Sequence, residues 1–319
     1  MTSVTSPTSP TAASATVRGA VQDVAGRLAS AGVPSPRFDA VALLAHVLEV
    51  PHGEVERLVV LGAPLPDPAA AALEPLVARR VAREPLQHLT GRAAFRRLEL
   101  RVGPGVFVPR PETEQVVQAV LDELTGLLES AGSAGSAGSA PVVVDLCTGS
   151  GAIPLAVKDE APQVQVLAVE LSPEALTWAE TNRSHLNLDV TLMLGDATLD
   201  PRSTPELAAL RPHLGAVDVV VSNPPYIPLG MVPRDPEVRD NDPELALYGG
   251  SADGLAIPMA VADQAARLLR PGGLLVMEHA DVQGADLVAR LTAAGPWRDV
   301  VDRLDLSGRP RYVLARRHG

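Results

Sequence analysis

The sequence predicts an α/β protein of two domains, in which a small N-terminal helical bundle is joined by a β-hairpin to a domain with a seven-stranded, mainly parallel sheet. Three observations support this prediction. Apolar residues recur at helical spacing over residues 17–83, and the period changes to two over residues 93–109. From residue 141 onward, apolar strands alternate with helices, which is typical of a parallel sheet covered on both faces. The length of 319 residues is sufficient for two domains.

The composition argues against several classes of protein. A net charge of −11 and an aromatic content of 3% are unsuited to coating or stacking on nucleic acid, so no stable nucleic-acid binding is expected. No apolar run approaches the ~18 residues of a membrane span, so no membrane association is expected. The single cysteine, Cys147, excludes an intramolecular disulfide and indicates a reducing, cytoplasmic location. The histidines show no ligand spacing, and no metal site is expected.

The N-terminal part is expected to begin with a disordered tail. Residues 1–16 are mainly Ser, Thr, Ala and Pro, without the apolar segment of a secretory signal. Helical spacing then predicts a helical domain over residues 17–91. Its helices are expected at residues 17–31, 37–50, 53–61 and 68–83.

A β-hairpin is predicted over residues 92–110, between the two domains. Leu98, Leu100 and Val102 alternate with charged residues, as on a half-buried strand. The Gly-Pro-Gly sequence at 103–105 is expected to turn the chain into a second strand at 106–108.

The remaining residues, 111–319, are predicted to form the α/β domain. A helix over 112–130 leads into a Ser-Ala-Gly repeat at 130–140, which we interpret as a flexible surface loop. Strands are expected at 141–146, 165–170, 190–194, 217–222, 273–278, 297–304 and 310–316. Helices are expected at 151–160, 173–186, 204–212, 256–269 and 283–294. The short spacing of the last two strands predicts an antiparallel hairpin at one edge.

The first strand of this domain leads into a glycine-rich turn followed by a helix. Asp145 follows an apolar run, and residues 147–151 read Cys-Thr-Gly-Ser-Gly. Glycines allow the backbone to approach a ligand closely, and the helix N-terminus follows, as in Rossmann-like folds. The next strand ends at Glu170, nineteen residues after Gly151, where a carboxylate can accept both hydroxyls of a ribose.

Two cofactors fit a carboxylate in this place, a dinucleotide and S-adenosylmethionine. The dinucleotide motif has a third glycine, which is absent from residues 152–154, although alanine is tolerated there in variants. Asp145 before the turn, and Asp196-Ala197 after the third strand, both favour S-adenosylmethionine. A carboxylate at Asp196 is also in the right place to meet an adenine amine.

A second motif, Asn223-Pro224-Pro225-Tyr226, follows the fourth strand at the same edge of the sheet. An amide or ring-attached NH₂ is a poor nucleophile because its lone pair is delocalised. We expect the Asn223 side chain and the Pro224 carbonyl to accept its two N–H bonds, which aims the lone pair at a sulfonium methyl in near-attack geometry. Tyr226 can cover a planar amide or base with its ring. The motif therefore indicates methyl transfer to a planar nitrogen.

At this point the sequence resembles the PrmC/HemK family of protein-(glutamine-N5) methyltransferases. The resemblance covers residues 17–319, and two of its blocks are Asp145–Ile153 and 223–227. The other two are Glu-Pro-Leu-Gln-His-Leu-Thr-Gly at 84–91 and Phe-Val-Pro-Arg-Pro-Glu-Thr-Glu at 107–114. The resemblance implies methylation of the glutamine in the Gly-Gly-Gln motif of peptide chain release factors, and recognition of the release factor by residues 17–91.

These motifs and the resemblance together define the expected site. The residues expected at the cofactor are Asp145, Cys147, Thr148, Gly149, Ser150, Gly151, Glu170, Asp196, Ala197 and Asn223. Those expected at the substrate are Asn223, Pro224, Pro225, Tyr226, Phe107 and Arg110, and the first four are also expected to carry the reaction.

The sequence departs from the family pattern at three of these positions. Cys147 stands where the family usually has glycine, and we interpret it as a packing residue rather than a nucleophile. Glu170 stands where Asp is common, and the longer carboxylate can still reach a ribose. Ala197 replaces an aromatic residue of some members, which loosens the packing expected around adenine.

Two further segments are given a structural rather than a catalytic interpretation from their own residues. Residues 235–250 form a polar loop, which is part of the active site in the family and is expected to be mobile. His279, after Glu278 at the end of a strand, is interpreted as structural.

Three alternative functions remain open at this stage. A DNA adenine-N6 methyltransferase shares Asn-Pro-Pro-Tyr, but it predicts a basic face and a target-recognition domain. A methyltransferase for another protein glutamine or a small amide fits the same motifs. A non-catalytic binding module would not need an intact reaction motif.

Overall fold

The computed structural model describes residues 16–133 and 140–319, and the chain divides into two compact units between Thr90 and Gly91. Residues 1–15 of the expected tail and residues 134–139 of the Ser-Ala-Gly repeat lie outside the described residues. The prediction for Thr16 was wrong, since this residue is not part of a tail. Its side chain accepts a hydrogen bond from the N–H of Gly19 and caps the first helix.

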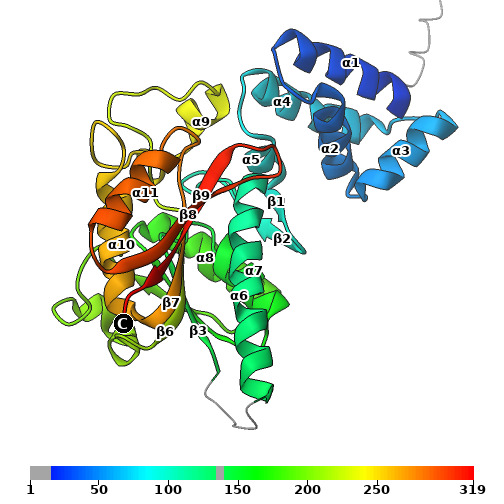
Figure 1. The fold of residues 1–319 in the computed structure, drawn as a ribbon. Helices are drawn as coiled ribbons and strands as arrows, with labels where there is room; N and C mark the ends of the chain where they lie inside the picture. Colours follow the sequence, from blue (N-terminus) through cyan, green and yellow to red (C-terminus); the bar gives the residue numbers. More distant parts are fainter. Residues whose placement is uncertain (1–15, 134–139) are drawn as a thin grey trace, which may run out of the picture. The chain divides into compact units, whose positions relative to one another are not determined.

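The first unit is helical, as expected (Figure 1). Its helices are α1 (Val17–Ser30), α2 (Pro36–Leu48), α3 (His52–Leu61), α4 (Asp67–Val81) and the short α5 (Leu86–Thr90). Val21, Leu28, Leu44 and Val77 belong to their common core. On α1 the buried residues Val17, Val21, Val24 and Leu28 recur every three to four residues, which places them on one face of the helix.

The second unit begins with a hairpin whose turn was predicted at the wrong place. Strand β1 (Arg92–Phe95) pairs antiparallel with β2 (Leu98–Arg101), so the turn lies at residues 96–97. Residues 103–108 form no strand. Arg96 takes the left-handed φ of 51° that a tight hairpin turn needs, so the chain reverses at residues 96–97. The alternation that begins at Leu98 therefore belongs to the second strand of the hairpin and not to the first.

A seven-stranded sheet forms the centre of the second unit, in the order β5-β4-β3-β6-β7-β9-β8. Its strands are β3 (Val142–Leu146), β4 (Gln165–Glu170), β5 (Thr191–Leu194), β6 (Val217–Ser222), β7 (Leu269–Glu278), β8 (Trp297–Leu304) and β9 (Pro310–Arg317). Strands β3 to β7 run parallel, and β9 is antiparallel to both β7 and β8. The predicted edge hairpin is confirmed.

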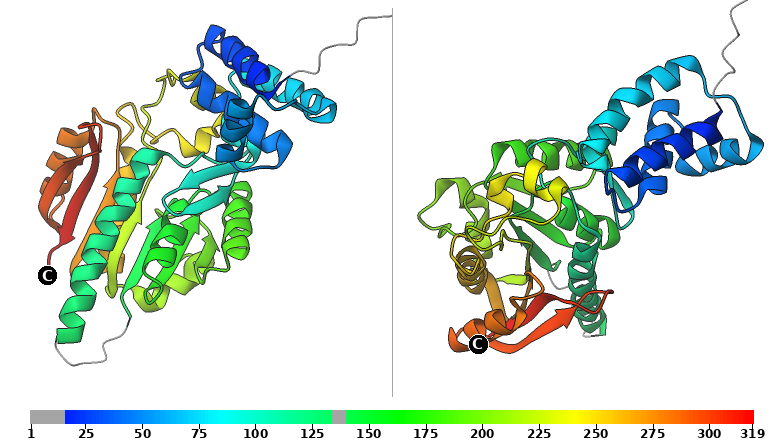
Figure 2. Two further views of the ribbon diagram at one scale, coloured as in Figure 1. Left: turned by 90° about the vertical axis from the view of Figure 1, so that its right-hand side faces the viewer. Right: turned by 90° about the horizontal axis from the view of Figure 1, so that it is seen from above.

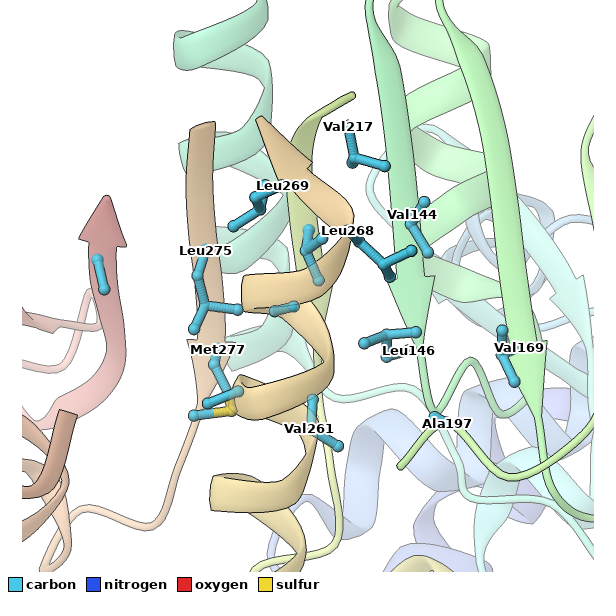
Figure 3. Close-up of a cluster of buried hydrophobic side chains, with 14 of the residues drawn as sticks. Val144, Leu146, Val169, Ala197, Val217, Val261, Leu268, Leu269, Leu275 and Met277 are labelled. Atoms are coloured by element: carbon cyan, nitrogen blue, oxygen red, sulfur yellow. The ribbon is translucent and has the colours of Figure 1, made fainter. Parts of the chain in front are cut away.

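Helices cover both faces of this sheet (Figure 2). On one face lie α6 (Glu114–Ser133), α7 (Ala152–Glu160) and α8 (Pro173–Leu186), and on the other lie η2 (Pro205–His213), α10 (Ala256–Leu268) and α11 (Gly284–Ala293). Successive strand residues point to opposite faces, so Val143 packs under α6 and α7 while Val144 packs under α10. Figure 3 shows the second of these cores, with Val144, Leu146 and Met277 from the strands against Val261 and Leu268 from α10.

Several element boundaries differ from the predictions. Residues 205–213 form a 3₁₀ helix rather than an α-helix, with a non-helical Leu207 between two prolines. Helix α6 continues to Ser133, so the first residues of the predicted 130–140 loop are helical. Helix α10 ends at Leu268, and β7 starts at the next residue, four residues earlier than predicted. Among residues 16–133 and 140–319, no helix is long and apolar enough to cross a membrane.

Candidate active site

A cavity of about 420 Å³ lies where the parallel strands β3, β4 and β6 end. Strand β3 has β4 on one side and β6 on the other. The strand order therefore reverses at β3, and the carboxyl end of β3 is the topological switch point of the sheet. Open α/β sheets bind their ligands in the crevice at this point. Twelve of the expected site residues line the cavity: Phe107, Arg110, Cys147, Thr148, Gly149, Ser150, Glu170, Asp196, Ala197, Asn223, Pro225 and Tyr226.

Three expected site residues do not line the cavity, and they support the residues that do. Gly151 has a φ of 83°, and a Cβ there would lie 3.0 Å from Leu155 Cδ1 and 3.4 Å from Ala179 Cβ, so glycine lets the turn pack closely on the helices. Pro224 is buried beside Asn223. Asp145 is fully buried beneath the turn.

The glycine-rich turn is hydrogen-bonded to the neighbouring strand β4. The N–H groups of Cys147 and Thr148 both donate to the Val169 carbonyl, at 3.1 and 3.0 Å. Cys147 has a φ of 69°, a conformation that favours glycine. Burial, with the nearby carboxylates of Glu170 and Asp145, raises the pKa of its thiol well above the ordinary value. A protonated thiol in this place is consistent with a packing role.

Glu170 joins the same turn to the start of α8. Its carboxylate accepts hydrogen bonds from the N–H groups of Gly149 at 2.7 Å and Ser172 at 2.8 Å. Burial raises the pKa of Glu170 above its ordinary value, and these two donors oppose that shift. A carboxylate held at the tip of β4 in this way is suitable for accepting ribose hydroxyls.

Asp145 carries unsatisfied polar atoms under the turn. Among the described residues, neither of its carboxylate oxygens nor the hydroxyl of Thr148 makes a hydrogen bond of ordinary geometry, although the Thr148 side chain lies near enough to the carboxylate to act on it. Burial raises the pKa of Asp145 to about 7, the Thr148 side chain opposes that shift, and the charge of Glu170 adds to it. Buried polar atoms without partners are costly, so they indicate a place for a polar ligand group. The ammonium group of S-adenosylmethionine has the hydrogen-bond donors that these oxygens lack, so the residues fit this cofactor.

The Asn-Pro-Pro-Tyr segment is held rigidly where it leaves β6. The N–H of Ile227 donates to the Leu247 carbonyl at 2.7 Å, and the N–H of Gly249 donates to the Ile227 carbonyl at 2.9 Å. Gln283 donates from Nε2 to the carbonyls of Tyr226 and Asp253, both at 2.8 Å. The chain from β6 is therefore pinned on two sides before it enters the loop.

Close backbone contact in this loop requires a glycine. A Cβ on Gly254 would lie 2.1 Å from the Tyr226 carbonyl oxygen, and Gly254 has a φ of 75°. No other residue type fits both the approach and the φ. Gly254 and Gln283 were not among the expected site residues, because nothing in their local sequence shows what they contact.

Two buried residues of the cavity were also missed at the sequence level. Thr113 comes from η1 (Pro111–Thr113) and Glu278 from the end of β7, and the Thr113 hydroxyl donates to Glu278 Oε2 at 2.7 Å. Asn223 Nδ2 donates to Thr113 Oγ1 at 3.3 Å, and the Tyr226 hydroxyl donates to Glu278 Oε1 at 3.2 Å. A signal was available for Glu278, since it ends an apolar strand at the same sheet edge as Asn223.

Phe107 and Arg110 line the same cavity. The Arg110 guanidinium carbon is 4.8 Å from the centroid of the Phe107 ring. Arg110 Nη2 donates to Asp242 Oδ2 at 2.6 Å, and the Asp242 carboxylate is buried. Asp242 follows α9 (Pro236–Asn241), so part of the polar segment interpreted as a loop is helical, and the segment contributes the buried carboxylate of a partly buried ion pair.

His279 lies outside the cavity and is fully buried. Its Nδ1 is 2.8 Å from the Ala280 carbonyl and its Nε2 is 3.1 Å from Asp302 Oδ1. These contacts are consistent with the structural interpretation.

The last strands of the sheet identify the class of protein. In a fully parallel dinucleotide-binding sheet no strand reverses, whereas here β9 enters antiparallel between β7 and β8. A seven-stranded mixed sheet of this kind, with its cavity beyond β3 and Asn-Pro-Pro-Tyr beyond β6, is typical of class I methyltransferases. The chain is a methyltransferase of this class, with S-adenosylmethionine as the methyl donor.

Comparison with known proteins identifies the family. Residues 19–91 match the PrmC N-terminal domain, and residues 138–303 match a methyltransferase domain. The release factor glutamine methyltransferase of Streptomyces coelicolor is 49% identical, over 91% of this chain and 94% of that protein. The protein of the same name from Bifidobacterium longum is 45% identical, over 92% and 97%. The chain belongs to the release factor glutamine methyltransferase family, which confirms the resemblance seen in the sequence.

One relative bears a different name. The 4-amino-L-phenylalanine/4-methylamino-L-phenylalanine methyltransferase of Streptomyces pristinaespiralis is 36% identical, over 92% of this chain and 93% of that protein. That name describes an acceptor nitrogen attached to an aromatic ring rather than an amide. Any test of the substrate must therefore include both kinds of nitrogen.

Proposed function

We propose that this protein transfers a methyl group from S-adenosylmethionine to the side-chain amide nitrogen (N5) of the glutamine in the Gly-Gly-Gln motif of peptide chain release factors. The observation that carries the proposal is the position of Asn223 and Tyr226. They line the cavity together with the cofactor turn and with Phe107, so an amide bound at these residues would lie beside the cofactor. The full-length relatives named for this activity support the same substrate.

The residues of the cofactor half have separate roles in the proposal. Asp145 and Thr148 would satisfy the ammonium group of the cofactor, and Glu170 would accept the ribose hydroxyls. Asp196 and Ala197 would border the adenine. When bound, S-adenosylmethionine supplies a methyl group activated by the positive charge on sulfur.

The residues of the substrate half prepare the amide nitrogen. The oxygen of Asn223 would accept one N–H of the glutamine amide, and the Pro224 carbonyl would accept the other. Accepting both hydrogens draws the lone pair out of conjugation, and fixed placement supplies much of the rate. Tyr226 and Phe107 would hold the flat amide by their rings. The methylated nitrogen is acidic, so it loses its proton without a strong base.

The helical unit has the complementary role in the proposal. Residues 19–91 match the N-terminal domain of the family, and we propose that this unit recognises the release factor. A cytoplasmic location is part of the same proposal, because the lone Cys147 suits a reducing compartment.

The test is a methyl-transfer assay with labelled S-adenosylmethionine and four acceptors, analysed by mass spectrometry. The acceptors are a release factor with Gly-Gly-Gln, the same protein with Gln→Ala, duplex DNA and 4-amino-L-phenylalanine. We expect one methyl group on the Gly-Gly-Gln peptide and none on the Gln→Ala protein. Label on adenine would instead establish a DNA methyltransferase. Label on 4-amino-L-phenylalanine alone would show that the cavity accepts an arylamine in place of an amide.

A further inference from the structure

Glu278 connects both ends of the Asn-Pro-Pro-Tyr segment. Its side chain is buried, with 2% of the residue exposed, and each carboxylate oxygen accepts one hydrogen bond. One bond comes directly from the hydroxyl of Tyr226. The other comes from the hydroxyl of Thr113, which in turn lies 3.3 Å from the Asn223 side-chain amide. The carboxylate is therefore linked to the acceptor-binding amide through a single hydroxyl group.

The Thr113 hydroxyl fixes which group of the Asn223 amide faces it. A threonine hydroxyl has one hydrogen to donate, and a carboxylate can only accept. The 2.7 Å contact between Thr113 Oγ1 and Glu278 Oε2 uses that hydrogen, at a distance usual for an O–H donor on a charged acceptor. Thr113 can then only accept from Asn223, so the amide must turn its NH₂ group toward Thr113. The oxygen of the Asn223 amide consequently lies on the side away from Thr113.

The direction of this amide decides whether the site can hold a primary amide. A glutamine NH₂ has two hydrogens to donate, so it needs an oxygen facing it. A reversed Asn223 would present its own NH₂ group, and two donors would oppose each other. The orientation of an asparagine amide is ordinarily ambiguous, because its oxygen and nitrogen have the same shape. Here the donor chain that begins at Glu278 removes the ambiguity.

We propose that Glu278 and Thr113 are positioning residues of the methyl transfer, which hold the Asn223 amide with its oxygen toward the acceptor nitrogen. The inference rests on the proposed function, because only a donor nitrogen needs this orientation. It also gives the Tyr226–Glu278 contact a role, since one carboxylate then fixes both residues that border the amide.

The charges around Glu278 determine the pH at which this arrangement holds. The charges that act on its carboxylate are those of Arg311 on β9 and Glu112 on η1, and the titratable hydroxyl of Tyr226 donates to it. Arg311 also forms an ion pair with Asp305 at 3.1 Å, so its positive charge acts on both Asp305 and Glu278. Burial raises the pKa of Glu278 to about 7, and the charge of Glu112 adds to the shift. A protonated Glu278 can donate to Thr113, which frees the hydroxyl hydrogen for the Asn223 oxygen and reverses the amide. Activity should therefore fall as the pH falls through about 7.

The first experiment measures kcat and KM for a Gly-Gly-Gln acceptor in the variants Glu278→Met and Thr113→Val, which remove the acceptor and the hydroxyl, and the pH profile in Glu278→Gln, which removes only the titration. We expect kcat to fall by about tenfold or more in Glu278→Met and Thr113→Val, while the Kd of S-adenosylmethionine stays within about twofold. Thr113→Ser keeps the hydroxyl and should keep most of the wild-type kcat. The acid limb of the wild-type profile should be absent from Glu278→Gln. The matched controls are Glu99→Gln and Thr125→Val, both exposed and away from the cavity.

The second experiment observes the Asn223 amide itself and does not depend on turnover. The sequence contains only four asparagines (Asn182, Asn187, Asn223 and Asn241), so selective ¹⁵N-asparagine labelling gives few side-chain signals. The signal missing from Asn223→Ser identifies this residue. We expect its NH₂ resonances to titrate with the acid limb in the wild type, and to stay constant with pH in Glu278→Gln.

The outcomes separate this inference from the proposed function. Wild-type kcat in Glu278→Met, or an Asn223 signal that does not respond to pH, would overturn the inference even if glutamine is methylated. A titrating Asn223 signal in a wild type that fails to methylate glutamine would instead retain the orienting chain and overturn the proposed substrate. A Thr113→Ser variant as impaired as Thr113→Val would show that packing, and not the hydroxyl, is what matters.

Discussion

The Glu170 carboxylate at the end of β4 accepts a hydrogen bond of 2.7 Å from the N–H of Gly149 in the turn after β3. The side chain expected to hold the ribose is therefore also the side chain that holds the glycine turn in place. Cofactor binding and the local structure of the turn depend on the same two oxygen atoms.

Replacing Glu170 should therefore affect both properties. In Glu170→Gln one backbone N–H of Gly149 or Ser172 must face an amide NH₂, so we expect the Kd of S-adenosylmethionine to rise by about 10- to 100-fold. Glu170→Ala leaves both N–H groups unpaired and should also lower the free energy of unfolding by about 2 kcal/mol. Calorimetric titration and denaturant unfolding measure the two effects. The exposed Glu180→Gln on α8 is the control, and an unchanged Kd in Glu170→Gln would contradict the ribose assignment.

Removing the Asn223 side chain should separate catalysis from cofactor binding. In Asn223→Ala the amide nitrogen of the substrate loses its acceptor, and we expect kcat to fall by about 10²- to 10³-fold. The Kd of S-adenosylmethionine should change by less than about threefold, because the turn and Glu170 are intact. Asn187→Gly, at the exposed C-cap of α8, is the matched control. Full transfer by Asn223→Ala would exclude the proposed role.

The buried Asp145 should make the ligand-free protein less stable as the pH rises. Its pKa is about 7 in the folded chain and about 4 in the unfolded chain, so between these values only the folded state keeps the proton. The contribution of this group to stability is therefore lost progressively between about pH 4 and 7. We expect Asp145→Asn to be more stable than the wild type at pH 8, by about 2–4 kcal/mol, and to have nearly the same stability at pH 4.

Urea unfolding of both proteins at the two pH values checks this prediction. Comparing the variant with the wild type at each pH cancels the other titrating groups. The same variant should bind S-adenosylmethionine more weakly, because a carboxylate that would face the ammonium group is gone. A variant less stable than the wild type at pH 8 would show that contacts to the ionised Asp145 outweigh the cost of burying its charge.

The Arg110–Asp242 pair should affect the acceptor rather than the cofactor. The Asp242 carboxylate is buried, so Arg110→Ala leaves a buried charge without its partner and should loosen the segment after α9. We expect KM for the Gly-Gly-Gln acceptor to rise by about tenfold, with an unchanged Kd for S-adenosylmethionine. In a double-mutant cycle with Asp242→Asn, the coupling free energy should be about 1–3 kcal/mol. Additive effects would show that the pair does not act as a unit.

Cys147 offers a test of backbone strain. Its φ of 69° favours glycine, so Cys147→Gly relieves strain in the folded state while it frees the unfolded chain. We expect a change in unfolding free energy within about 1 kcal/mol, unchanged kcat, and a clear loss of stability in Cys147→Val. Since burial raises the pKa of this thiol, alkylation at pH 8 should be slow. Loss of methyl transfer in Cys147→Gly would indicate a chemical role for the sulfur.

Much of the fold could be predicted because the information is local. Strands β3 to β7 are apolar runs or alternations, and the helices between them show helical spacing, so burial alone marks their positions. Parallel strands end at one edge of the sheet, so Asp145, Glu170 and Asn223 could be assigned to one site before any coordinates were known. The hairpin turn was misplaced because Gly-Pro-Gly is a stronger turn signal than the Arg96-Arg97 pair that forms the turn.

The sequence by itself determined the class of fold, the cofactor turn and the reacting segment, since each is a short pattern whose chemistry can be read in order. Only the tertiary structure decided which groups orient that chemistry. Thr113 and Glu278 are 165 residues apart in the chain, and Arg110 and Asp242 are 132 apart. No periodicity connects such pairs. Thr113 and Glu278 meet because β7 ends beside β6 in the folded sheet and η1 lies against the ends of both. Arg110 and Asp242 meet because the segment after α9 folds back against the residue before η1. Both contacts are therefore a property of tertiary structure rather than of local sequence.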